Sequence, residues 1–257
     1  MWRQIPLIKA PGQLQMAIDS WLLQQHILGN HPPTLRFYTW SPPAISLGYH
    51  QHNYPENWRN ITWQGEKLDL VRRPSGGRAV LHQGDLTYSV VISGLKGTRV
   101  EAYQLICEFL IQGFASLGLN LDYGNAGRGY IHNPNCFGTA TGADLVTSDG
   151  AKLIGSAQLR KGSAILQHGS IRLNQDTKLF TEVFGVEAEN KDINLEHLEH
   201  LEHLENLGEA SIPVITDALV AAARKCFDFK SSLGIDMEER SLSDGEWLEI
   251  QNHLKTI

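Results

Sequence analysis

The chain has 257 residues, of which 42% are hydrophobic and 19% charged, a composition typical of a globular protein with one large core and room for a small appendage. The net charge of −6 argues against nucleic-acid binding by the whole surface and favours a small anion or an acidic protein as partner. The first residues lack a long apolar segment, and no apolar run reaches the ~18 residues that span a bilayer, so we expect a cytoplasmic protein without membrane contact.

The first part of the chain predicts one helix followed by strands. Apolar side chains recur at helical intervals after the break at Pro11-Gly12, and the later extended runs are rich in β-branched and aromatic residues. Pro42-Pro43 separates two of these runs. The predicted elements are a helix at 13–28 and strands at 34–40, 44–49, 68–73 and 79–92.

The second part predicts a helix, another β region and a final helix. We expect Leu105, Phe109, Ile111 and Phe114 on the buried side of the first of these helices. Ser148-Asp149-Gly150 is typical of a hairpin turn. The predicted elements are helices at 102–117 and 214–227 and strands at 144–146, 152–158 and 164–168.

Residues 195–205 repeat a Leu-Glu-His triplet. On a helix this period traces an inclined leucine stripe, and the repeated histidines are potential metal ligands, but nothing nearby completes a coordination sphere. We interpret the segment as a solvated or low-complexity insert. We expect a catalytic domain over 1–210 that carries it, followed by a small helical extension over 211–257 packed on that domain.

Three cysteines are an odd number, and they lack the CxxC spacing of zinc sites, so neither a disulfide framework nor a metal site is indicated. Cys107 and Cys226 fall in helix-forming stretches, where we expect structural roles. Cys136 lies among turn residues at 133–142, where a thiol is not expected as core filler. We therefore consider Cys136 a candidate nucleophile.

Residues 72–82 set three guanidinium groups around a Gly-Gly turn. A glycine pair allows positive φ and close approach of a ligand, while arginines offer planar donors to phosphate or carboxylate. An ordinary surface hairpin explains Gly76-Gly77 alone equally well. Lys152 begins a predicted strand after a tight turn, and an ammonium group beside a thiol lowers its pKa. From the residues alone, a Cys136–Lys152 pair is only one hypothesis.

Several segments resemble, in one order, the motifs of the lipoate/biotin protein ligase superfamily, over about residues 10–190. Within it the chain most resembles octanoyltransferases of the LipM type. The resemblance implies an α/β fold with a mixed β-sheet flanked by helices. The segments that carry it are 47–51, 71–82, 86–89, 136–137, 150–158 and 166–169.

The resemblance implies transfer of an octanoyl group from octanoyl-acyl carrier protein to a lysine of a lipoyl domain, such as that of glycine cleavage H protein or a 2-oxoacid dehydrogenase E2, without a cofactor. Cys136 is then the nucleophile that forms a thioester, and Lys152 lies beside it. The residues implied at the substrate site are Arg72, Arg73, Ser75, Gly76, Gly77, Arg78, His82, Gly155, Ser156, Ala157, Gln158 and His168.

Alternatives remain open. An ATP-dependent lipoate-protein ligase working through lipoyl-adenylate uses the same loop and Lys152 but needs no cysteine, so Cys136 favours the transferase. An amidotransferase between lipoyl domains, a biotin-type ligase and a non-enzymatic module that binds acylated carrier domains are further candidates. The sequence also departs from the family at Gln83-Gly84-Asp85, since an acidic residue more often follows the histidine directly.

Overall fold

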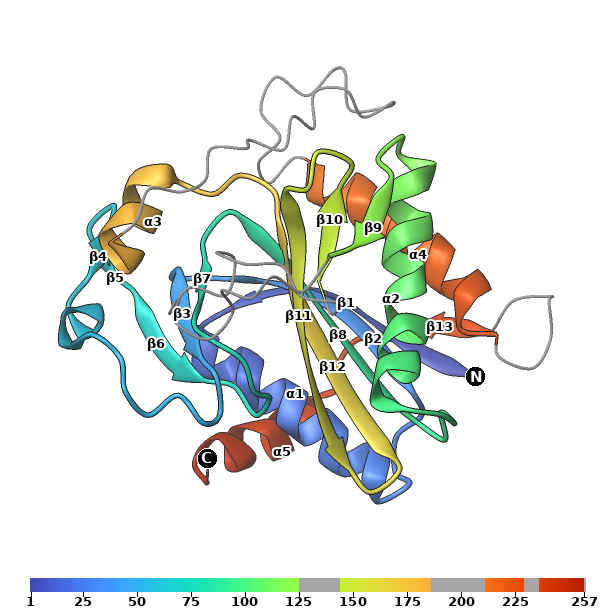
Figure 1. Cartoon of the computed structure of the whole chain (residues 1–257). Helices are drawn as coiled ribbons and strands as arrows, with labels where there is room; N and C mark the ends of the chain where they lie inside the picture. Colours follow the sequence, from blue (N-terminus) through green and yellow to red (C-terminus); the bar gives the residue numbers. More distant parts are fainter. Residues whose placement is uncertain (125–143, 186–210, 229–235, 257) are drawn as a thin grey trace.

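The computed structural model describes residues 1–124, 144–185, 211–228 and 236–256, and its centre is an eight-stranded mixed sheet (Figure 1). The strand order is β13-β1-β2-β8-β12-β11-β10-β9, with β1 parallel to both of its neighbours and the other pairs antiparallel. The strands are β1 (Trp2–Ala10), β2 (Thr34–Trp40), β8 (Asp85–Ser93), β9 (Leu121–Tyr123), β10 (Leu145–Thr147), β11 (Lys152–Lys161), β12 (Ala164–Arg172) and β13 (Met237–Glu239). The expected α/β fold with a mixed sheet is confirmed.

A second sheet of three strands packs beside the first, in the order β6-β3-β7. Both outer strands pair with β3, β6 in parallel and β7 antiparallel, so the Arg/Gly loop between them crosses the end of β3 and is not a hairpin turn. These strands are β3 (Ala44–Leu47), β6 (Asp69–Arg72) and β7 (Val80–His82); a short 3-10 helix, η1 (Glu56–Arg59), and the ribbon β4 (Thr62–Trp63) and β5 (Glu66–Lys67) lie between β3 and β6 in the chain.

The single strand expected over 79–92 is two strands, β7 and β8, which belong to different sheets. The chain turns between them at Gly84, whose φ is +65°. A Cβ atom at this position would lie 1.7 Å from the carbonyl oxygen of Asn174, so the close approach of two backbones requires glycine here.

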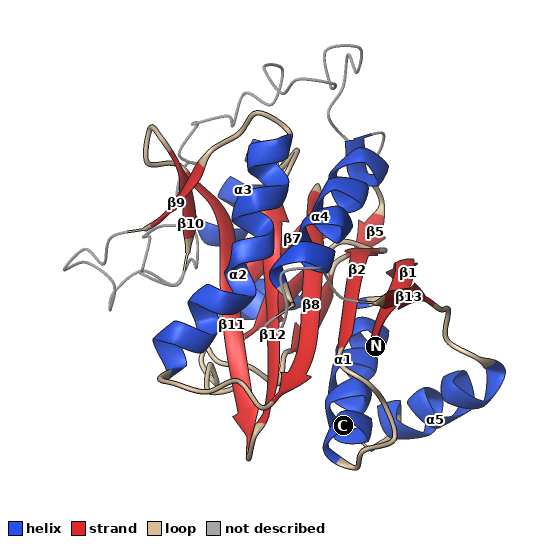
Figure 2. Cartoon of the chain, turned by 90° about the vertical axis from the view of Figure 1, so that its right-hand side faces the viewer, coloured by secondary structure: helices blue, strands red, loops and turns tan. Residues whose placement is uncertain are grey.

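Helices cover both faces of the large sheet (Figure 2). Val90 packs with residues of α2 and α4 on one face, and its neighbour Val91 packs with residues of α1 and α5 on the other, as alternation along a strand requires. The helices are α1 (Gly12–Ile27), α2 (Arg99–Ser116), α3 (Thr177–Phe184), α4 (Ile212–Cys226) and α5 (Asp244–Leu254).

The buried side of α2 differs from the predicted one by one position. Ile106, Phe109 and Phe114 are fully buried, whereas Leu105 is 41% exposed. The helix is capped by Thr98, whose side chain accepts a hydrogen bond from the Glu101 backbone N–H in a capping box. The expectation that Leu105 is buried is therefore wrong.

The segment after residue 211 contributes to both faces and to the sheet itself. Helix α4 packs on α2 closely enough that a Cβ atom on Gly113 would lie 2.6 Å from Leu219 Cδ2. Strand β13 pairs with β1, and helix α5 packs on α1. None of the helices in the described ranges combines the length and apolarity needed to cross a bilayer.

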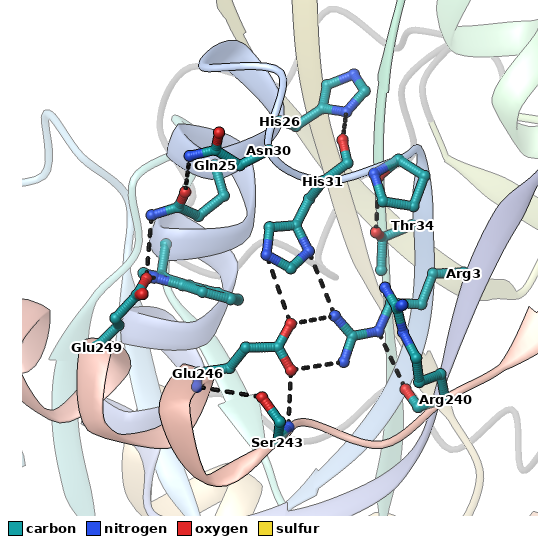
Figure 3. A network of polar contacts seen from close by, with 12 residues as sticks. Arg3, Gln25, His26, Asn30, His31, Thr34, Arg240, Ser243, Glu246 and Glu249 are labelled. Carbon is teal, nitrogen blue, oxygen red and sulfur yellow. Dashed lines mark hydrogen bonds and ion pairs between the residues drawn. The ribbon is translucent and has the colours of Figure 1, made fainter.

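The guanidinium of Arg3, only 1% exposed, connects β1 to the C-terminal segment (Figure 3). It donates hydrogen bonds to the carbonyl oxygens of Arg240 and Ser241 and two to the Glu246 carboxylate, at 2.6 and 3.0 Å. Glu246 also accepts from the backbone N–H of Ser243 and so caps α5. One carboxylate thus both begins the last helix and holds it to the N-terminal strand.

Candidate active site

A cavity of about 320 Å³ lies between the Arg/Gly loop and strands β11 and β12. Its floor is largely apolar and is formed by α1, β2 and β7, while glycines and charged side chains lie around the rest. Gly77 and Arg99 on its wall are exposed, so the cavity opens to solvent there. The floor residues are Met16, Tyr38, Trp40 and Val80.

Arg73 holds the Arg/Gly loop in shape. Its guanidinium donates to the carbonyl oxygens of Gly76, at 2.8 and 3.1 Å, of Arg78, at 2.6 Å, and of Ser46 on β3, at 2.8 Å. Gly77 has φ +95°, and a Cβ atom there would lie 2.8 Å from the Arg73 guanidinium. The carbonyl groups of Gly76 and Arg78 therefore face the buried guanidinium of Arg73, which stabilises the conformation of the loop.

Arg72 lies outside the cavity. Its side chain donates to the carbonyl oxygens of Gly48 and Gln51, at 2.8 and 2.9 Å, and so fixes the loop that follows β3. Arg73 and Arg78 line the cavity, so two of the three arginines predicted at an anion site reach it.

A buried chain of polar groups connects the Arg/Gly loop to α1 and β2. The Ser75 hydroxyl is hydrogen-bonded to His168 Nε2, His168 Nδ1 lies 2.9 Å from Asp19, and Arg36 Nε donates to Asp19 at 2.8 Å. Burial raises the pKa of Asp19, but Arg36 and His168 outweigh it and lower the pKa to about 2. The ionised Asp19 accepts a hydrogen bond from Nδ1–H of His168, which leaves Nε2 to accept a hydrogen bond from the Ser75 hydroxyl.

A second chain of the same type lies on the opposite wall. Ser46 Oγ lies 2.8 Å from His82 Nε2, and His82 Nδ1 lies 2.8 Å from Asp85 Oδ2. Burial lowers the pKa of His82, although Asp85 opposes this shift. The ring of Trp40 stacks on His82 with centroids 3.9 Å apart. Asp85, three residues after the histidine, thus provides a carboxylate that orients the His82 ring.

Lys152 begins β11 and its side chain is buried at the cavity wall. Its Nζ lies 3.0 Å from Oδ2 of Asp144, which is buried too. The Asp144 carbonyl accepts a hydrogen bond from Gly124 N–H at 2.9 Å, which joins the two described ends on either side of 125–143. Cys136 and the 195–205 triplets lie outside the described residues.

The wall formed by β11 and β12 has a network of uncharged polar groups. Tyr88 Oη donates to Ser156 Oγ at 2.8 Å and accepts from Gln167 Nε2 at 3.1 Å. Gln158 Nε2 donates to Gln167 Oε1 at 2.9 Å across the strand pair. A Cβ atom on Gly169 would lie 2.4 Å from Ser156 Oγ, so glycine keeps this wall open.

Most of the residues predicted from the sequence meet at this cavity. Ser75 does not line the cavity, but its hydroxyl is hydrogen-bonded to His168, which does. The predicted residues that line it are Arg73, Gly76, Gly77, Arg78, His82, Lys152, Gly155, Ser156, Ala157, Gln158 and His168.

Sequence reasoning missed the carboxylates at the site. Asp19 lies in the middle of α1 between the apolar residues Ile18 and Leu22, and a charged residue on a buried helical face is the signal that was available. Asp85 and Asp144 each stand directly before a β-rich run. Among the described residues no cluster of three or more metal-ligating side chains is found.

The two described thiols have high pKa values. Burial raises the pKa of Cys107 to about 12 and that of the half-buried Cys226 to about 11. Both side chains pack with the core on the α2 and α4 face of the sheet. Neither is a thiolate at neutral pH.

Comparison with known proteins gives consistent results. A sequence model of the lipoyl protein ligase A/B catalytic domain matches residues 11–224. Octanoyltransferase LipM of Anoxybacillus flavithermus is 34% identical, over 99% of this chain and 94% of its own length, and that of Bacillus subtilis is 35% identical, over 98% and 93%.

Solved structures with the same fold include a lipoate-protein ligase A bound with ATP, with a TM-score of 0.73 and 20% identity, covering 99% of this chain and 95% of that one. The putative lipoate protein ligase Ta0514 of T. acidophilum with bound lipoic acid has a TM-score of 0.72 and 19% identity, covering 100% and 96%. These two likenesses concern the fold.

Proposed function

We propose that this chain, which belongs to the lipoyl protein ligase A/B catalytic domain family, is an octanoyltransferase of protein lipoylation that takes its octanoyl group from acyl carrier protein and transfers it through a thioester on Cys136. The acceptor is a lysine of a lipoyl domain, and the reaction takes place in the cytoplasm. The observation that carries the proposal is the cavity, because it combines an apolar floor with a buried lysine at its wall.

The first step is attack of the Cys136 thiolate on the carrier-bound thioester. The Cys136–octanoyl bond forms, the bond to the carrier's sulfur breaks, and that sulfur takes up the proton that Cys136 gave away. Cys136 precedes Asp144 by eight residues, and a chain of that length spans at most about 28 Å. Asp144 lies at the cavity wall, so a connection of this length allows the thiol to reach the site.

The second step is attack of the acceptor lysine's amine on the acyl-enzyme. The ε-ammonium group loses two protons: one is taken up by the departing Cys136 sulfur and one is released. The ammonium group of Lys152, held by Asp144 at 3.0 Å, stabilises the thiolate in both steps. The amide product is more stable than the thioester, which makes this step favourable.

The oxyanion of each tetrahedral intermediate needs donors that are already in place. Gly76 and Gly77 line the cavity, and among the described residues no hydrogen bond from either backbone N–H is found. Arg73 holds the Gly76 carbonyl oxygen from the other side. We assign the oxyanion site to these two amides.

The apolar floor accounts for recognition of the acyl chain. About seven methylene and methyl groups of an octanoyl chain, at roughly 0.8 kcal/mol each, contribute on the order of 5 kcal/mol when buried. A cavity of about 320 Å³ is at the lower end of the range for small-molecule sites, which suits a short linear chain.

Intact mass after incubation with octanoyl-carrier protein, without ATP, tests the proposal. We expect a hydroxylamine-sensitive adduct one octanoyl group heavier, located on Cys136, and its loss in Cys136→Ala. Cys226→Ser is the matched control and should keep the adduct. If no adduct forms and transfer requires free acid with ATP, the chain is a lipoate-protein ligase. Full transferase activity in Cys136→Ala also excludes the acyl-enzyme.

A further inference from the structure

A second cavity, of about 310 Å³, lies behind the wall formed by Trp40 and His82. Both side chains line the two cavities, so they separate them. The second cavity is also lined by Gly84 and Asn174, which are exposed, and it therefore reaches the protein surface. Nothing in the proposed acyl transfer uses this space.

The Ser46–His82–Asp85 chain runs from the first cavity to the second. Ser46 lines the first cavity and Asp85 lines the second, with hydrogen bonds of 2.8 Å on each side of the His82 ring. Thr87 and Ser170 also donate to Asp85 Oδ2, at 3.2 and 2.7 Å. Among the described residues no hydrogen bond to Asp85 Oδ1 is found, and the Asp85 side chain, 3% exposed, lines the second cavity.

The other serine–histidine–aspartate chain ends differently. Beyond His168, Asp19 is 0% exposed and meets Arg36 and the hydroxyl of Tyr38, at 2.8 and 3.1 Å. That carboxylate is fully buried against a permanent cation, so it orients His168 and has no exposed oxygen from which to pass a proton. The two chains have the same chemistry, but within the described part of the chain only the one through Asp85 connects the first cavity to the second.

We propose that Ser46, His82 and Asp85 form a relay that carries the proton released on amide formation out of the acyl cavity to water in the second cavity. The relay rests on the proposed function, because that function sets the proton balance. Thioester exchange between two sulfurs releases no net proton, whereas amide formation from an ε-ammonium releases one. The relay therefore serves the second half-reaction and not the first.

Each step of the relay conserves protons. Ser46 accepts a proton from the amine side and passes its own to His82 Nε2. His82 in turn transfers its Nδ1 proton to Asp85 Oδ2, and the protonated carboxyl group gives up that proton to water in the second cavity; a flip of the His82 ring then restores the starting tautomer for the next turnover. An imidazole suits this role because it binds and releases protons near neutral pH. The charged or titratable groups that act on His82 are Asp85, Arg73 and His168.

Single-turnover kinetics of Asp85→Ala test the relay. We expect octanoyl-enzyme formation to stay within about threefold of wild type, and its aminolysis by a lipoyl domain to slow at least tenfold, since positioned proton-transfer groups contribute about 10²–10⁴-fold. Sodium formate should enter the second cavity and restore aminolysis, whereas formamide, a neutral molecule of the same shape, should not.

Two further variants separate a relay from a structural role. Asp85→Asn keeps the size of the side chain and should slow aminolysis without rescue by formate, because no space is left for it. Asp19→Ala breaks the other histidine–aspartate pair, and we expect it to slow both half-reactions without rescue. Thermal unfolding of each variant reports its stability.

The outcomes for the relay and for the proposed function are distinct. If wild type transfers no octanoyl group from the carrier, the proposed function and the relay fall together. If wild type is active but Asp85→Ala slows both half-reactions equally, or its aminolysis does not respond to formate, the relay alone is overturned. A folded Asp85→Asn variant with wild-type aminolysis overturns it as well.

Discussion

Gly48 lies directly against the carbonyl group of Gly77, so that a Cβ atom on Gly48 would be 1.8 Å from the Gly77 oxygen. Gly77 lines the cavity proposed to bind the acyl chain, and its loop is held from the other side by Arg73. The loop therefore cannot move aside without losing these hydrogen bonds. In Gly48→Ala we expect octanoyl transfer to fall more than tenfold and the free energy of unfolding to fall by about 1–3 kcal/mol. Initial rates and thermal unfolding measure the two effects.

Gly245→Ala is the matched control for this substitution, because a Cβ atom on Gly245 meets no heavy atom within 4 Å. Gly245 lies in α5, where alanine is the better helix former, so we expect unchanged transfer and equal or higher stability. Wild-type transfer rates in Gly48→Ala would show that the contact with Gly77 does not position the loop.

Lys152 is expected to serve both half-reactions. Its Nζ is paired with a buried carboxylate at the cavity wall. Among the β11 residues that line the cavity, Lys152 alone carries a positive charge, and Lys152→Ala removes it. We expect octanoyl-enzyme formation and aminolysis each to fall at least 10²-fold, measured separately by intact mass. Lys161→Ala, an exposed lysine at the other end of β11, is the control and should keep both rates. An unaffected acylation rate would confine Lys152 to the second step.

Iodoacetamide distinguishes the three cysteines. With pKa values raised by burial to about 12 and about 11, the thiolate fractions of Cys107 and Cys226 at pH 8 are on the order of 10⁻⁴ and 10⁻³. We expect the first alkylation to occur at Cys136 and to abolish octanoyl transfer, with peptide mapping as the measurement. Labelling of Cys226 at the same rate as Cys136 would contradict this order.

The periodicity of apolar residues along the sequence predicts much of this fold but not all of its strands. The helix at 13–28 and the strand at 34–40 have clear periodicity, and the structure forms both within one residue of the expected bounds. The strand β1 was missed because Pro6 interrupts its pattern. The pairing of β1 with β2 shifts register between Ile5 and Ile8, and this irregularity accommodates a proline inside a paired strand.

The site could be predicted in part because its loops keep motif residues close in sequence. The Arg/Gly loop and the start of β11 are such segments. The carboxylates that pair with the two histidines at the site could not be predicted in this way. Asp19 and His168 are 149 residues apart, and only the packing of α1 against the sheet brings them together. Which carboxylate orients which histidine is therefore decided by tertiary structure.

Glu246 should make stability depend on pH in the acid range. Burial raises its pKa, but the Arg3 guanidinium and the Ser243 backbone N–H outweigh this and lower the pKa to about 2. Because the folded value lies below the unfolded value of 4.5, the stabilisation is fully present above about pH 4.5 and is lost as pH falls towards 2. We expect Glu246→Gln to lower the unfolding temperature at pH 7, and the difference from wild type to shrink between pH 4.5 and 2.

Glu238→Gln is the control for this pH dependence, since Glu238 is an exposed residue of β13 in the same C-terminal segment. Its unfolding temperature should follow that of wild type at every pH. A difference between wild type and Glu246→Gln that stays constant down to pH 2 would mean that the ionised carboxylate is not what holds α5 to β1.

Met16 lies on the apolar floor of the cavity proposed to hold the acyl chain. Its side chain is 4% exposed and packs with Tyr38 and Trp40 on the cavity floor. Met16→Ala removes the end of that side chain, so the cavity becomes deep enough for a longer acyl group. Two extra methylene groups at about 0.8 kcal/mol each correspond to roughly a tenfold change in preference. We expect the ratio of decanoyl to octanoyl transfer to rise by about that factor.

Met237→Ala controls for the loss of core packing, because Met237 is equally buried, at 2% exposed, but lies on β13 away from the cavity. Both substitutions should cost about 2–5 kcal/mol of stability. Only Met16→Ala should change the acyl preference, measured by competition between decanoyl- and octanoyl-carrier protein in one reaction. If the two variants show the same ratio, Met16 does not set the length of the cavity, and the limit must come from another part of its wall.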